Sequence, residues 1–96
     1  MQEIEIFSVT VQRFYIDTNG HHQQMVDNAP LVGLYKSLER AMEIVREYCS
    51  IWTDVPSFGY KVEHHKKCAD FEYCAVVGNH SGPVSAYTVH KHFITV

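Results

Sequence analysis

The chain has 96 residues, of which 46% are hydrophobic and 20% charged, and its formal net charge is −3. These values indicate one globular domain and exclude a disordered chain, which would have few apolar residues and a high net charge. They also exclude generic attraction to nucleic acid, which needs an excess of basic residues, and a large cofactor enclosed in so small a core.

The start of the chain and its cysteines indicate the cellular compartment in which we expect the protein. Residues 1–5 lack the basic start and long apolar run of a secretory signal peptide, and no segment is apolar for long enough to span a bilayer. The three cysteines are an odd number without a CxxC pair. At least one thiol then stays free, which suits a reducing compartment. We therefore expect a cytoplasmic protein with no membrane partner.

The first third of the chain predicts strands. Residues 3–16 form a long strand pattern with apolar side chains on both faces. Asn19-Gly20 predicts a tight turn, because this pair tolerates positive φ angles. A polar return strand over 22–27 and a short apolar strand over 31–36 follow, with Pro30 between them.

Residues 37–52 predict a single amphipathic helix. Ser37 supplies the hydroxyl of an N-cap, and the helix must end before Pro56. Residues 32–41 resemble a strand-to-helix junction met in many small bacterial and phage proteins, and this resemblance implies the junction but no activity. Apolar residues three or four apart form one stripe along the helix: Leu38, Ala41, Met42, Val45, Tyr48, Cys49 and Trp52.

The remaining residues predict three more strands. Apolar and polar residues alternate from Phe58 to Glu63, with His64 and His65 continuing the strand, and again over 71–77 and 84–96. The last two strands should form an antiparallel hairpin. We therefore predict one α+β domain spanning residues 1–96. One antiparallel sheet of about five or six strands packs against a single helix, in the approximate order βββαβββ.

Two histidines raise the question of a metal site. His90 and His92 are two residues apart on a predicted strand, so both imidazoles point to one face and could bind one zinc ion. The sequence offers no second fixed pair of ligands. We therefore predict no metal and no other cofactor, with His90 and His92 as the ligands if that prediction fails.

A basic cluster suggests an alternative function. Histidines and lysines near residue 65, with two more histidines after the Asn-Gly turn, could bind a small anionic ligand, whereas nucleic acid is not an expected partner. The residues proposed for this small-ligand site are His21, His22, His64, His65, Lys66 and Lys67.

Catalysis is the second alternative. Cys68 or Cys74 with a histidine and Asp70 could form a nucleophilic site, but no spacing enforces it, and the phosphate-binding and hydrolase motifs are missing. We predict no catalytic residues and keep a small hydrolase or nuclease as the weaker alternative.

The main functional expectation comes from the two-sided apolar strands. One helix cannot cover both faces of the sheet, and uncovered apolar surface is typical of a partner surface. We expect a non-catalytic protein-interaction or regulatory module, acting as a homodimer or on another protein. This class includes inhibitors that phages encode against host defence. The predicted interaction surface consists of Phe7, Val9, Val11, Tyr87, Val89 and Phe93.

Overall fold

A computed structural model describes residues 2–16, 22–24, 30–80 and 82–96. Its single antiparallel sheet and single long helix confirm the predicted α+β fold and the order βββαβββ. The elements are β1 (Glu3–Ile16), β2 (His22–Gln24), β3 (Leu31–Tyr35), α1 (Leu38–Thr53), a 3₁₀ turn η1 (Pro56–Phe58), β4 (Lys61–His65), β5 (Tyr73–Asn79) and β6 (Gly82–Thr95).

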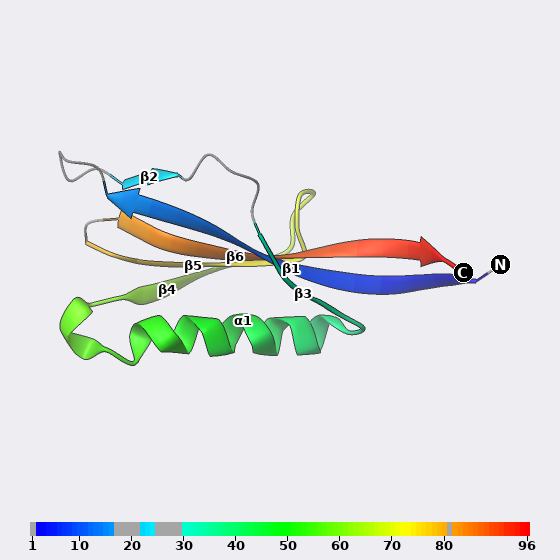
Figure 1. Cartoon of the computed structure of the whole chain (residues 1–96), viewed down its shortest axis with the longest axis horizontal. Coiled ribbons are helices and arrows are strands. Elements are labelled where there is room, and N and C mark those ends of the chain that lie inside the picture. Colours follow the sequence, from blue (N-terminus) through cyan, green and yellow to red (C-terminus); the bar gives the residue numbers. More distant parts are fainter. Residues whose placement is uncertain (1, 17–21, 25–29, 81) are drawn as a thin grey trace.

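The sheet is organised around the two longest strands, β1 and β6. Its order is β2-β1-β6-β5-β4, and β3 also pairs with β1 (Figure 1). β3 pairs with residues 7–10 of β1 and β2 with residues 14–16, so both lie on the edge of β1 away from β6. The β1–β6 ladder runs from Glu3 opposite Thr95 to Arg13 opposite Ser85. Strands from the two ends of the chain therefore form the centre of the sheet.

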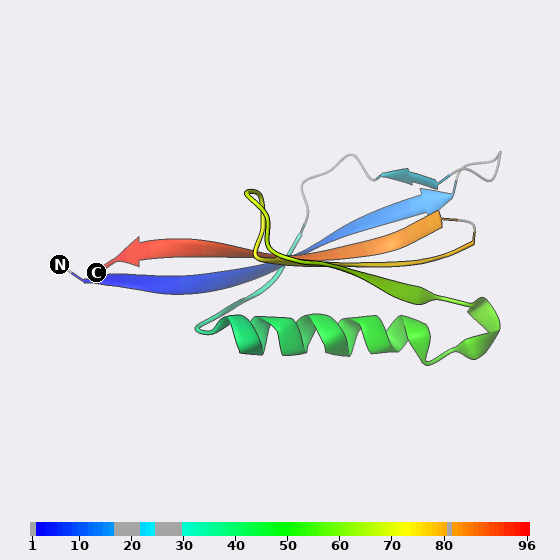
Figure 2. The same cartoon turned by 180° about the vertical axis from the view of Figure 1, so that it is seen from behind.

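α1 lies along one face of this sheet (Figures 1 and 2). Ser37 is the N-cap, as predicted: its Oγ accepts a hydrogen bond from the Arg40 amide at 3.1 Å. Ala41, Val45 and Cys49 are buried. Leu38, Met42 and Trp52 are partly buried against the same core, whereas the predicted polar face is exposed, which confirms the orientation of the helix.

The core fills the space between α1 and the sheet. Residues opposite each other in the ladders point to the same face, and the odd-numbered residues of β1, β5 and β6 face the helix. Trp52 Nε1–H donates a hydrogen bond of 2.9 Å to Tyr87 Oη, so the polar ends of both rings are satisfied where they meet. The buried sheet residues in this core are Phe7, Val9, Val11, Tyr73, Ala75, Val77, Tyr87 and Val89.

The beginning of β4 differs from the prediction. The predicted strand begins at Phe58, but residues 56–58 form a 3₁₀ turn and β4 begins at Lys61. Pro56 occupies the first turn, and Gly59 has a φ of 66°, in the left-handed region that glycine adopts without strain. These two residues override the alternation of apolar side chains. The predicted hairpin of β5 and β6 is confirmed.

The strands are longer than the helix that covers them. α1 has 16 residues and spans roughly 24 Å, whereas β1 and β6 have 14 residues each and span roughly 46 Å. The ladder therefore continues past the helix as a two-stranded projection, formed by residues 2–6 and 92–96, which we call the ribbon. Both ends of the chain lie at its tip (Figure 2), and the whole molecule is 54 Å long.

Candidate interaction surface

The face of the sheet opposite α1 carries a mixed apolar patch where the ribbon begins. Ile4 lies opposite Ile94, Ile6 opposite His92, and Ser8 between His90 and Leu34. No described helix packs on this face. Ile4, Leu34 and Ile94 are 40%, 58% and 41% exposed. The open-face patch is defined as Ile4, Ile6, Leu34, His90, His92 and Ile94.

The two histidines of this patch lie beside each other, as the sequence predicted. Their ring centroids are 6.5 Å apart, and His92 Nε2 is hydrogen-bonded to Ser8 Oγ at 2.8 Å. Within the described residues, no group of three or more histidine, cysteine or acidic side chains could hold a metal ion. The two imidazoles place polar groups beside the apolar side chains of this patch.

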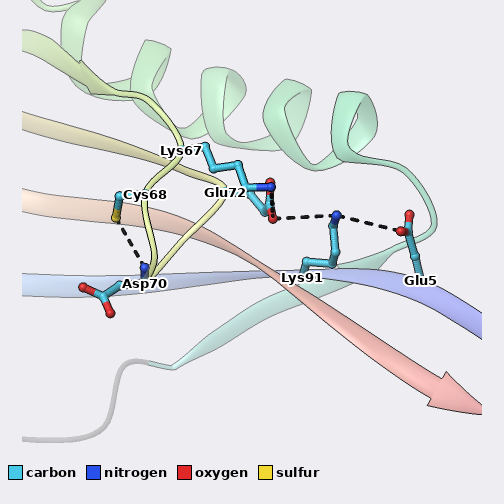
Figure 3. Close-up of polar contacts among 6 residues, drawn as sticks. All are labelled: Glu5, Lys67, Cys68, Asp70, Glu72 and Lys91. Atoms are coloured by element: carbon cyan, nitrogen blue, oxygen red, sulfur yellow. Dashed lines mark hydrogen bonds and ion pairs between the residues drawn. The ribbon is translucent and has the colours of Figure 1, made fainter.

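On the helix-facing side of the sheet, where the ribbon begins, charges join three parts of the chain (Figure 3). Lys91 Nζ lies 3.8 Å from Glu5 Oε1 and 3.8 Å from Glu72 Oε1, and Lys67 Nζ lies 3.4 Å from the same Glu72 oxygen. Lys91 Nζ also lies 5.9 Å from the centroid of the Phe93 ring. These contacts connect residues 66–72, which join β4 to β5, with β6 and β1.

Of the residues predicted to bind an anionic ligand, the four whose side chains the structure describes do not converge on one site. His64 contacts Tyr73 Oη on the helix side, with stacked rings 5.9 Å apart, whereas His65 points to the opposite face and lies 3.8 Å from Glu63. Lys67 is paired with Glu72, and Lys66 is exposed. His21 lies outside the described residues, and so does the side chain of His22.

The predicted interaction surface requires a correction. Of its six residues, only Phe93 is exposed; the other five, Phe7, Val9, Val11, Tyr87 and Val89, are buried beneath α1. The sequence showed apolar residues on both faces, and α1 covers the more apolar one. Ser8, Thr10, Thr88 and His90 occupy the opposite face, and these polar residues were the signal that it faces outward.

Cys49 and Tyr73 lie in the core beneath α1, and their surroundings shift the pKa of both. Burial raises the pKa of the Cys49 thiol to about 11, and Cys74 acts in the same direction. Burial, and then the neighbouring Cys49, raises the pKa of Tyr73 as well. A thiol with so high a pKa is a poor nucleophile at neutral pH, because only the thiolate reacts. Cys49 therefore serves as a packed core side chain.

A second apolar region lies on the outer side of α1. Ile44, Tyr48 and Ile51 follow one another at helical spacing, and with Glu47 and with Tyr35 of β3 they line a shallow groove of about 300 Å³. Ile51 is 68% exposed. This groove offers mainly apolar side chains. The ribbon offers apolar side chains and, in addition, the exposed backbone edges of two strands.

Comparison of the chain with protein-family models, with curated proteins and with solved structures found no match. Among the described residues, no helix is both long enough and apolar enough to cross a membrane. The chain's own contacts, burial and charges are therefore what indicates a function.

Proposed function

We propose that this chain is a non-catalytic protein-interaction module of the cytoplasm, with a regulatory or inhibitory role, that binds a protein through the open-face patch and the ribbon. The observation that carries this proposal is the exposure of Ile4, Phe93 and Ile94 on a projection that extends beyond the helix.

Physical chemistry favours a protein as the occupant of this surface. A two-stranded ribbon by itself is marginally stable in water, so one with large exposed apolar side chains gains stability when another surface covers it. The patch is a sheet surface and not a deep pocket, and its apolar residues lie beside two imidazoles that can form hydrogen bonds. Apolar residues with hydrogen-bonding groups at their rim are characteristic of protein interfaces.

Affinity capture from the cells that produce the chain tests this proposal with two matched variants. Ile94→Lys places a charge in the open-face patch, and Ile51→Lys places the same charge on the outer side of α1. Both residues are exposed, so both variants should fold. We expect a partner that wild type and Ile51→Lys retain and Ile94→Lys loses.

Two results would contradict the proposal. Loss of the partner only with Ile51→Lys would move the interface to the groove on α1. Capture of no specific protein, by a chain that also does not associate with itself, would remove the protein-interaction function altogether.

A further inference from the structure

The backbone of β6 has one edge that the neighbouring described strand, β5, occupies only in part. Gln2 and Val96 exchange two N–H···O bonds, each of 2.9 Å, so they are a hydrogen-bonded pair of the antiparallel ladder. Such pairs alternate along a ladder, so the even-numbered residues of β6 direct their N–H and C=O groups to β1. The odd-numbered residues direct theirs to the other edge. Val89 confirms this, because its carbonyl accepts from the Glu72 amide on the β5 side.

β5 covers only part of that edge. Its pairing with β6 reaches Tyr73 opposite Val89 and goes no further. Lys91, Phe93 and Thr95 follow, and their N–H and C=O groups face away from β1. In the described part of the chain, no strand pairs with them. We call these three residues the β6 edge.

We propose that two copies of this chain associate by pairing their β6 edges antiparallel, which joins their sheets across a two-fold axis at Phe93. This inference rests on the proposed protein-interaction function and names its partner as a second copy. Lys91 of one copy then lies opposite Thr95 of the other, and the two Phe93 residues lie opposite each other. His92 and Ile94 of the two open-face patches also become neighbours.

The register follows from which backbone groups are free. Centred on Phe93, the pairing uses all three residues of the β6 edge in each copy. A shift by one residue towards Val89 would need its carbonyl, which Glu72 already occupies. In the proposed register Val96 of one copy reaches His90 of the other, where the structure has a hollow of about 260 Å³ lined by residues 67–72, His90 and Lys91.

Charge selects the β6 edge over the other edge of the ribbon. On β1 the open positions are Glu3 and Glu5, and self-pairing there would set carboxylates opposite each other, which is destabilising. Pairing of the β1 edge with the β6 edge of another copy would be head-to-tail, which gives a ring or an open filament in place of a two-fold dimer. On the β6 edge the proposed register sets Lys91 opposite the uncharged Thr95, so no like charges meet. The exposed Phe93 rings meet as an aromatic cross-strand pair.

A charge reversal at Thr95 tests the register. In the dimer Thr95 lies opposite Lys91 of the second copy, so Thr95→Lys opposes two like charges and Thr95→Glu opposes unlike charges. Because the contact occurs twice, we expect Thr95→Lys to weaken self-association about tenfold and Thr95→Glu to preserve or strengthen it. Within one chain Thr95 lies opposite Glu3. Thr95→Lys should therefore stabilise the folded monomer and Thr95→Glu should destabilise it, the reverse of their effects on self-association.

Sedimentation equilibrium up to about 1 mM chain measures the association, over the affinity range of a small interface. Amide exchange provides a second readout: the Phe93 and Thr95 amides should become protected as concentration rises, and those of Glu3 and Glu5 should not. Circular dichroism checks that each variant is folded.

Three results would overturn the inference: a folded wild-type monomer at about 1 mM, equal association of the lysine and glutamate variants, or growth into oligomers beyond the dimer. A monomer that still captures a partner, and loses it with Ile94→Lys, would remove the self-pairing and leave the proposed function standing.

Discussion

The two halves of the β1–β6 ladder share one backbone pairing and differ in what covers them. In the half beneath α1, Phe7 is 6% exposed, whereas in the ribbon Phe93 is 58% exposed. Both residues lie on the helix-facing side and each opposes a charged residue, Lys91 and Glu5 respectively. An unbroken hydrogen-bond ladder therefore does not show which part of a sheet contributes most to the stability of the fold. Burial of apolar area supplies most of the favourable free energy of folding, and the fully buried apolar side chains lie in the covered half.

The largest expected change in stability comes from replacing Phe7, and the same replacement of Phe93 should have almost no effect. Phe7→Ala should lower the free energy of unfolding by about 3–4 kcal/mol, because a buried ring leaves a cavity. Phe93→Ala, the same change in the ribbon, should change it by less than about 0.5 kcal/mol. Urea unfolding at low micromolar concentration, where association does not contribute, measures both. Equal losses would contradict the contrast between the two halves.

Alkaline pH should lower the free energy of unfolding, because two groups with raised pKa values lie in the covered half. The pKa of Cys49 rises from 9.0 to about 11 on folding, so the unfolded chain loses this proton first. The associated stability, roughly 2–3 kcal/mol, is fully present below pH 9 and is lost as the pH rises through about 11. The raised pKa of Tyr73 acts in the same direction. In urea melts over this range, Cys49→Ala should show a shallower decline than wild type; parallel declines would contradict the assignment.

The hydrogen bond that joins α1 to β6 gives a smaller effect. Tyr87→Phe removes the acceptor of the Trp52 Nε1–H group and should cost about 1–2 kcal/mol, because a part-buried donor loses its partner. Tyr48→Phe is the matched control. Its half-exposed ring lies 5.6 Å from that of Tyr87, and removal of its hydroxyl should leave stability nearly unchanged. Thermal unfolding that ranks the two variants the other way would refute this role of Tyr87.

Two buried serines provide the smallest and most discriminating test. Ser85 is almost fully buried, and its Oγ has no hydrogen-bond partner among the described residues, whereas Ser8 Oγ is bonded to His92. Ser85→Ala should therefore raise the free energy of unfolding by up to about 1 kcal/mol, and Ser8→Ala should lower it by about as much. Denaturant midpoints of the two variants should move in opposite directions. A loss with Ser85→Ala would mean that its hydroxyl is satisfied.

The helix and its cap were predictable because their signals are local. The stripe from Leu38 to Trp52 and the hydroxyl of Ser37 specify which face packs and where the helix begins, within a few residues of each other. The start of β4 was not predicted correctly. There Pro56 and Gly59 impose backbone angles that outweigh the alternation of Phe58, Tyr60 and Val62.

The interaction surface was less predictable because it depends on contacts between distant parts of the chain. Apolar residues occupy both faces of β1, and the sequence alone does not say which face α1 will cover. The polar residues Ser8 and Thr10 on one face were the usable signal. The β6 edge is open only because β5 pairs no further than Val89, a difference in strand lengths that no motif records.

The pairing of Gln2 with Val96 also has a kinetic consequence. The central ladder joins the two ends of the chain, so it can form only after nearly the whole polypeptide loop has closed. Folding slows as contacts span more of the sequence. A short linker between the adjacent ends, with a new opening in residues 66–72, would convert this ladder into a hairpin. Such a circular permutant should fold faster than the natural chain order and keep the same sheet.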